Sequence, residues 1–136
     1  MEECIHAIGS YKNKAKNVIC IAQKILKDYD GILPSDKDEL QKLPGVGNKT
    51  AGVIRAEIFK IPDFPVDTHI LRISKRLKLA KENADAFETE LALKKKFVKE
   101  NWIKLHHQLI HFGRDICVAR NPHCERCKLH EICVKK

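Results

Sequence analysis

Several features that decide a protein's class are missing from this chain of 136 residues. No apolar run is long enough to span a bilayer, and the N-terminus has no signal-peptide pattern. No segment alternates apolar and polar residues with the period of a strand, and there are no internal repeats or low-complexity tracts. These absences exclude a membrane-spanning protein and a repeat array, and we expect an all-α fold.

The composition is that of a globular protein with a modest core. Hydrophobic residues make up 43% and charged residues 32% of the chain, a length that forms one ordinary domain or two very small ones. Lysine and arginine total 26 against 18 acidic residues, which gives a formal net charge of +8. This surplus indicates a polyanionic partner without identifying it.

Apolar residues recur with a helical period along most of the chain. We expect helices over residues 2–8, 15–29, 35–43, 48–59, 67–77, 84–99 and 102–113. Ser35 is the expected N-cap of the third helix, and Gly113 is the expected end of the last one. Phe87, Leu91 and Val98 are expected to share one side of the sixth helix.

A glycine turn precedes the fourth expected helix. The segment reads Leu43-Pro44-Gly45-Val46-Gly47-Asn48-Lys49-Thr50. Glycines let a phosphate approach the backbone closely, and N–H groups at a helix start point outward. Lys49 falls in the first helical turn, where the helix dipole disfavours a protonated amine. The alternative is a plain helix–turn–helix corner with a solvated lysine.

Four of the six cysteines lie within the last twenty residues, spaced C-x6-C-x2-C-x5-C. They are Cys117, Cys124, Cys127 and Cys133. This clustering, without a secretory signal, argues for a metal centre in a reducing compartment rather than for disulfides. Spacing alone leaves zinc slightly ahead of an iron–sulfur cluster. Cys4 and Cys20 have no spaced partners, and we interpret them as structural thiols.

Arg120 lies at the tip of the loop between the first two clustered cysteines. An arginine held there by a metal centre meets a phosphate at little entropic cost. A solvated surface charge is an equally good interpretation of the pattern.

These pieces, in this order, make the chain resemble the endonuclease III family of helix–hairpin–helix DNA glycosylases. The resemblance is carried by the segment 43–51, by Val66-Asp67-Thr68-His69, by the four cysteines, and by Gly9, Tyr11, Lys14 and Ala15. It implies the helix–hairpin–helix DNA glycosylase fold, a partial six-helix domain, and a helical domain that holds a [4Fe–4S] cluster on the four cysteines.

The function that the resemblance implies is base excision repair. The enzyme removes oxidised pyrimidines from duplex DNA as an N-glycosylase and then cuts the strand at the abasic site by β-elimination. Matched by position, Lys49 is the catalytic lysine and Asp67 the catalytic aspartate. From the pattern alone Asp67 is rather a helix N-cap, and both roles can hold together. His69 is expected to be a local structural partner.

The resemblance also implies a surface for the DNA backbone. Gly45, Val46 and Gly47 would offer N–H groups, with a bridging monovalent cation, and Thr50 and Arg120 would add side-chain contacts. We expect a monomer that acts on double-stranded DNA with a damaged pyrimidine or an abasic site. We expect no membrane partner, and a bacterial or archaeal cytoplasmic location near the nucleoid.

Chains of this family begin well before the equivalent of Met1. We therefore expect residues 1–61 to form a partial helical domain with the hairpin, and residues 62–136 to form the cluster domain. The inner faces of 15–29 and 51–58 should be partly exposed, and activity impaired. The alternative function is a catalytically incompetent, cluster-stabilised DNA-binding fragment, and a zinc-held scaffold is a third possibility.

Overall fold

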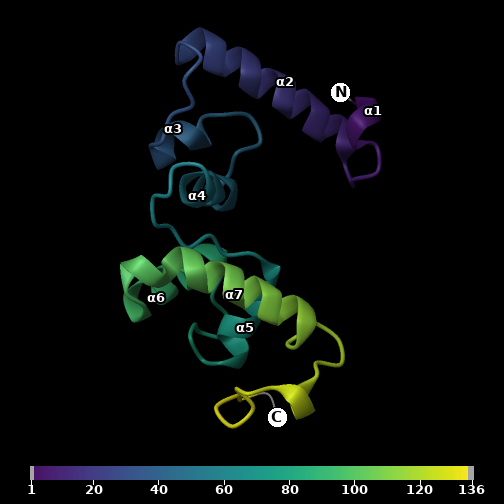
Figure 1. Ribbon diagram of the computed structural model, residues 1–136, viewed down its shortest axis with the longest axis vertical. Coiled ribbons are helices and arrows are strands. Elements are labelled where there is room, and N and C mark those ends of the chain that lie inside the picture. Colours follow the sequence, from purple (N-terminus) through teal and green to yellow (C-terminus); the bar gives the residue numbers. More distant parts are fainter. Residues whose placement is uncertain (1, 135–136) are drawn as a thin grey trace. The chain divides into compact units, whose positions relative to one another are not determined.

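The computed structural model describes residues 2–134, which form helices joined by turns and loops (Figure 1). In chain order the helices of this part are α1 Glu2–Ile5, α2 Tyr11–Asp28, α3 Lys37–Gln41, α4 Asn48–Glu57, α5 Thr68–Arg76, α6 Ala86–Lys96, the 3-10 helix η1 Lys99–Asn101, α7 Trp102–Asp115 and the 3-10 helix η2 Cys124–Arg126. Since residues 2–134 contain no strand, the all-α prediction is confirmed. Throughout this range, every helix is too short or too polar to cross a membrane.

The chain divides into two compact units, residues 1–51 and residues 52–136. Helix α4 starts in the first unit and continues into the second. The domain boundary expected after residue 61 stays a prediction.

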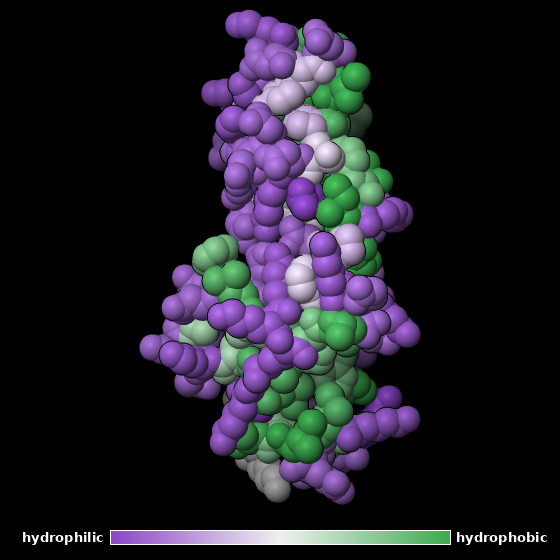
Figure 2. Space-filling model, turned by 90° about the vertical axis from the view of Figure 1, so that its left-hand side faces the viewer, coloured by the Kyte–Doolittle hydropathy of each residue, from purple (hydrophilic) through white to green (hydrophobic). Residues whose placement is uncertain are grey.

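The long helix of the first unit leaves most of its apolar side chains in solvent. Within α2, all of which is described, only Ala15 is buried. Val18 and Ile19 are exposed, and Leu26 is 71% exposed. Figure 2 shows hydrophobic side chains gathered along one edge of the upper part of the molecule, beside a hydrophilic surface. The partial exposure expected for the segment 15–29 is therefore present.

The cap of α3 differs from the expectation, which placed Ser35 at the N-cap. The N-cap is Asp36, whose backbone is extended and whose carboxylate accepts hydrogen bonds from the N–H groups of Asp38 and Glu39. A carboxylate one residue later in the chain therefore satisfies two of the free N–H groups at the helix start. Leu40 of α3 is fully buried.

The core of the second unit lies where the segment before α5 meets α6 and α7. Its buried members are Phe64, Val66, Ile70 and Leu93, packed against Leu71, Leu79, Phe97, Trp102, Leu105, Leu109 and Ile110. The indole Nε1 of Trp102 donates to the carbonyl of Phe97 at 2.8 Å, so this large, partly buried side chain has its polar group satisfied. Burial of these side chains fixes the segment that leads into α5.

The bounds expected for α6 are wrong. The helix spans Ala86–Lys96 rather than 84–99, because a capping box between Asp85 and Glu88 starts it later. Phe87, Leu91 and Val98 are exposed, while the buried residues of α6 are Thr89, Glu90 and Leu93. The buried side is partly polar because Glu90 belongs to an ion-pair network, and a purely hydrophobic periodicity misses such a face.

Gly113 does not end the last helix as expected, because α7 continues to Asp115. A Cβ at this position would lie 2.8 Å from the Cβ of His69. The glycine therefore permits close packing of α7 against α5 instead of terminating α7.

Candidate active site and cysteine cavity

The turn before α4 depends on glycine at one position. Gly45 has a φ of +74°, and a Cβ there would lie 2.3 Å from the side-chain nitrogen of Asn17. The N–H of Val46 donates to the carbonyl of Leu43 at 3.1 Å, which closes the turn. The carbonyl of Gly47 then accepts from the N–H of Ala51 and starts α4. The expected glycine hairpin at a helix start is therefore present.

Not all the N–H groups of this turn face outward. The N–H of Val46 is used within the turn. Gly45 and Gly47 are exposed, and in the part of the chain that is described their N–H groups donate to no protein acceptor. An anion at this turn would therefore find its backbone donors at the two glycines rather than at Val46.

Lys49 is the second residue of α4, and its side chain is exposed, as is that of Thr50. The expected placement of Lys49 in the first turn of a helix after the glycines is thus observed. It belongs to the first unit, whereas Asp67 belongs to the second.

Asp67 is the N-cap of α5. Its Oδ1 accepts hydrogen bonds from the N–H groups of His69 and Ile70, both at 2.9 Å. Its Oδ2 accepts no hydrogen bond from residues 2–134, and the side chain is half-buried. The capping interpretation is therefore confirmed, and one carboxylate oxygen is left for a second role. His69 bonds locally through Nδ1 to Nη2 of Arg72 at 3.2 Å.

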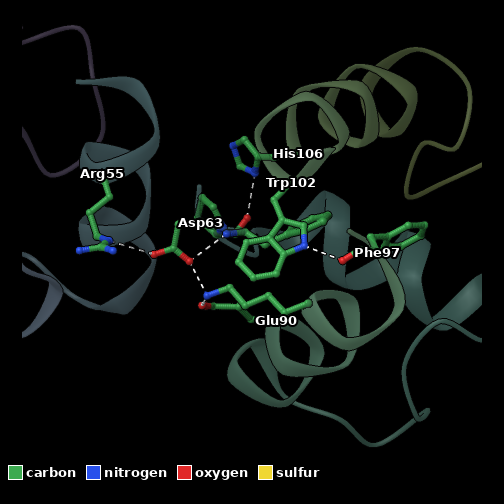
Figure 3. A network of polar contacts seen from close by, with 9 residues as sticks. Arg55, Asp63, Glu90, Phe97, Trp102 and His106 are labelled. Atoms are coloured by element: carbon green, nitrogen blue, oxygen red, sulfur yellow. Dashed lines mark hydrogen bonds and ion pairs between the residues drawn. The ribbon is translucent and has the colours of Figure 1, made fainter. Parts of the chain in front are cut away.

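The segment that leads to Asp67 is held by a buried carboxylate, Asp63 (Figure 3). Its Oδ1 accepts from the N–H of Phe64 at 2.9 Å and from Nζ of Lys94. Its Oδ2 lies 3.6 Å from Nε of Arg55, which belongs to α4. Asp63 therefore ties the linker to both α4 and α6.

A second carboxylate completes this network, since Lys94 also donates to Glu90 at 2.5 Å. Asp63 and Glu90 are 2% and 1% exposed. Burial by itself would lower the pKa of Lys94, but the hydrogen bonds to Asp63 and Glu90 outweigh it and raise that pKa. Two buried carboxylates are thus held by cations, which is the condition under which burial of charge is tolerated.

His106 holds the same linker from α7. Its Nδ1 lies 2.9 Å from the carbonyl oxygen of Pro65, so Nδ1 carries the proton and donates (Figure 3). The ring is buried, and this burial lowers the pKa of His106. A neutral histidine therefore fixes the backbone two residues before Asp67.

The four clustered cysteines line one cavity in the second unit. Arg76, Ile116, Pro122, His123 and His130 complete its wall. Among residues 2–134, no three His, Cys, Asp or Glu side chains converge on a point that would hold one metal ion. The thiols instead surround a shared space, and a [4Fe–4S] cluster takes one thiolate on each of four irons. The donor set and its arrangement fit such a cluster.

Arg120 lies in the loop between Cys117 and Cys124 and is exposed. The loop is closed at its base, where the N–H of His123 donates to the carbonyl of Ile116 at 2.9 Å. The structure therefore presents Arg120 on a closed loop next to the cavity, as the sequence indicates.

A family model described as HhH-GPD superfamily base excision DNA repair protein matches residues 1–99. The chain belongs to this superfamily. Over residues 117–133 this HhH-GPD protein also matches the iron-sulfur binding domain of endonuclease III. The resemblance to the endonuclease III family is thereby confirmed, and so is a [4Fe–4S] cluster, rather than zinc, as the cofactor.

Relatives of this HhH-GPD protein are similar along nearly all of its length. Endonuclease III of Bacillus subtilis (strain 168) is 45% identical over 98% of the chain, and that of Escherichia coli (strain K12) is 38% identical over 97%. A solved non-covalent endonuclease III–DNA complex superposes with a TM-score of 0.94 at 43% identity, over 98% of the chain and 62% of that structure. The chain spans 61% and 62% of the lengths of the two curated relatives.

Sequence reasoning missed the residues that support these sites. Arg72 joins α5 to the end of α7 by donating to the carbonyls of Gly113 at 2.8 Å and Cys117 at 2.9 Å. Arg76, one helical turn later, faces the cysteine cavity. Arginines four positions apart lie on one face of a helix, and this spacing was the available signal.

Proposed function

We propose that this chain acts in base excision repair as a DNA N-glycosylase with AP lyase activity on oxidised pyrimidines in duplex DNA. The observation that carries the proposal is the placement of Lys49. Its exposed side chain starts a helix directly after a glycine turn, in a chain of a base excision repair superfamily. Lysine is the side chain that forms Schiff bases with sugar aldehydes, once its amine is unprotonated.

The proposed reaction begins when the damaged nucleotide is turned out of the stack. The neutral amine of Lys49 bonds to C1′ of the sugar, and the C1′–N bond to the base breaks. The base leaves with the bonding electrons and takes up a proton. The opened sugar forms a Schiff base with the amine. Loss of a C2′ proton then breaks the C3′–O bond, and hydrolysis of the Schiff base restores the amine.

Asp67 has a second role in this proposal. Its Oδ1 is occupied by the two N–H groups at the start of α5, which hold the side chain in one orientation. Its Oδ2 would stabilise positive charge that develops on the sugar, or accept and return protons. The links from Asp63 and His106 to the preceding segment support this orientation.

The proposed DNA contacts start at the turn. Gly45 and Gly47 would donate N–H groups to a backbone phosphate, with a monovalent cation bridging nearby. Val46 would stabilise the turn that presents these donors. The side chains of Thr50 and Arg120 are exposed and would add further phosphate contacts. We infer that Cys117, Cys124, Cys127 and Cys133 hold the cluster, that the protein works as a monomer, and that the domain boundary follows residue 61.

Borohydride trapping tests the proposal. One solved relative is a trapped covalent intermediate of endonuclease III with DNA. We expect this chain to form a covalent adduct with abasic-site duplex DNA when borohydride is present, since reduction makes the Schiff base permanent. The adduct is read as a slower band on a denaturing gel. Release of the base from a thymine-glycol duplex measures the glycosylase step separately.

Two variants control the trapping experiment. Lys49→Arg keeps the positive charge but cannot form a Schiff base, so DNA binding should persist while the adduct disappears. Lys42→Ala removes another exposed lysine of the first unit and should leave the adduct unchanged. An adduct that survives in Lys49→Arg removes Lys49 from the mechanism.

The second candidate function is a DNA-binding fragment without catalysis. It is favoured by the exposed Gly45, Gly47 and Arg120, which would suffice to bind phosphates without catalysis. It predicts binding that weakens steeply with salt and no trapped adduct in the unaltered chain. The same gel therefore separates the two functions.

A further inference from the structure

Arg76 is buried against the segment that carries the cysteines. It is the last residue of α5 and is 8% exposed. Its Nη1 donates to the carbonyl of Val118 at 2.9 Å, and its Nη2 donates to the carbonyl of Ala119 at 3.2 Å. Nη1 also lies 3.2 Å from Sγ of Cys117, within hydrogen-bonding distance of the sulfur. The guanidinium thus contacts the first cysteine directly.

The backbone of the same residue contacts the other end of the cysteine segment. The carbonyl of Arg76 accepts from the N–H of Val134 at 3.1 Å and from Sγ of Cys133 at 3.5 Å. Arg76 therefore joins the first and the last cysteine of the cavity through one residue.

The charge of Arg76 has no carboxylate partner within ion-pair distance among residues 2–134. Its acceptors are carbonyl oxygens and one sulfur, although a buried charge without a counter-charge is costly. The cavity that it lines is surrounded by four thiols, which are thiolates when they bind iron. An anionic centre in this cavity would supply the missing counter-charge.

We propose that Arg76 is a cluster-contacting residue, which balances the negative charge of the iron–sulfur centre, donates to the Cys117 thiolate and so sets the reduction potential. Net charge and hydrogen bonds to the sulfurs are among the factors that fix the potential of such clusters. Both contributions of Arg76 favour the more reduced, more negative form. The proposal rests on the cluster alone and holds whether or not the chain cleaves DNA.

Voltammetry of the purified, cluster-loaded protein tests whether Arg76 sets the reduction potential of the cluster. Arg76→Gln removes the charge, and we expect its midpoint potential to become more negative than that of the unaltered protein. Lys75→Gln is the matched control, because Lys75 precedes Arg76 on α5 and its side chain makes no hydrogen bond to a cysteine among residues 2–134. Iron and sulfide content show that each sample is loaded. Equal potentials for the two variants would overturn the proposal.

Arg76→Lys keeps the experiment decisive when the glutamine variant does not retain its cluster. Lysine preserves the charge but replaces the planar fork with a single point donor. It cannot serve Cys117, Val118 and Ala119 together, so we expect a loaded protein whose potential lies below that of the unaltered chain. A loaded Arg76→Lys protein with an unchanged potential would contradict the role of the guanidinium.

Discussion

His106 shows how one buried side chain fixes the backbone before a candidate catalytic residue. The neutral ring donates from Nδ1 to Pro65, and the residue is only 4% exposed. Besides burial, His107 lowers the pKa of His106, whereas Asp67 and Glu57 raise it, and His107 itself is 2.8 Å from a carboxylate oxygen of Glu57. Protonation of the ring would place a charge where burial disfavours it.

The pH dependence of stability follows from this burial. The pKa of His106 in the folded chain is lower than its ordinary value of 6.5, mainly because of burial. At pH values below 6.5, the histidine of the unfolded chain therefore binds a proton more readily than that of the folded chain. The contribution of His106 to the free energy of unfolding is therefore complete above pH 6.5. It is lost as the pH falls from 6.5 through the lower pKa of the folded state. We expect urea unfolding to show this loss.

A pair of histidine variants isolates the effect. His106→Gln does not titrate in this range, so its free energy of unfolding should fall less between about pH 7.5 and about pH 5.5 than that of the unaltered chain. His111→Gln changes an exposed histidine of the same helix and should keep the original pH dependence. A slope that is unchanged in His106→Gln would show that another group is responsible.

At the level of residues, the sequence predicts those features that depend on neighbours close together in the chain. The Asp67 cap and the Gly45 turn involve neighbours within a few positions, and both are present. Asp63 and Lys94 are 31 positions apart, and His106 and Pro65 are 41 apart. Such pairs are created by tertiary packing, and no periodicity in one sequence encodes them.

At the scale of elements, α5 and α7 approach each other at Gly113. A Cβ on Gly113 would lie 2.8 Å from Cβ of His69 and 3.0 Å from Cδ1 of Ile73. The first of these neighbours is attached directly to the backbone of α5, so it cannot swing away. A glycine near a helix end is usually a terminator, and this statistical rule fails here because interhelical distance imposes the same residue.

Gly113→Ala tests whether this close approach decides the stability. In a helix without neighbours the change would stabilise the protein by about 1 kcal/mol, since alanine is the better helix former. Here we expect destabilisation of about 1–3 kcal/mol, because the methyl group overpacks the contact with His69. Denaturant unfolding measures the sign.

Gly9→Ala is the control for Gly113→Ala. A Cβ at Gly9 would meet no atom within 4 Å, and the position does not have a positive φ. We expect a change within about 0.5 kcal/mol there. A Gly113→Ala protein as stable as the original would show that α7 can shift away from α5 at little cost.

At the scale of the whole molecule, two different forces hold the second unit together. The hydrophobic cluster around Phe64 and Ile70 is formed by residues between Phe64 and Ile110. In contrast, none of residues 117–134 is buried, and the one helix within this stretch is η2. With so little apolar burial, this stretch depends on the cluster and on the hydrogen bonds from Arg76.

Removal of the cluster should therefore unfold one part of the chain and not the rest. We expect oxidation and chelation of the iron to expose 117–134 to trypsin, with the first cuts at the exposed Arg120, Arg126 and Lys128. Helical circular dichroism should change little, because α5, α6 and α7 keep their core. The loaded protein, digested in parallel, should resist cleavage at these sites. Early cuts within α6 or α7, or a general loss of helix, would contradict this prediction. They would mean that the hydrophobic core alone does not keep the second unit folded and that the cluster stabilises the whole unit.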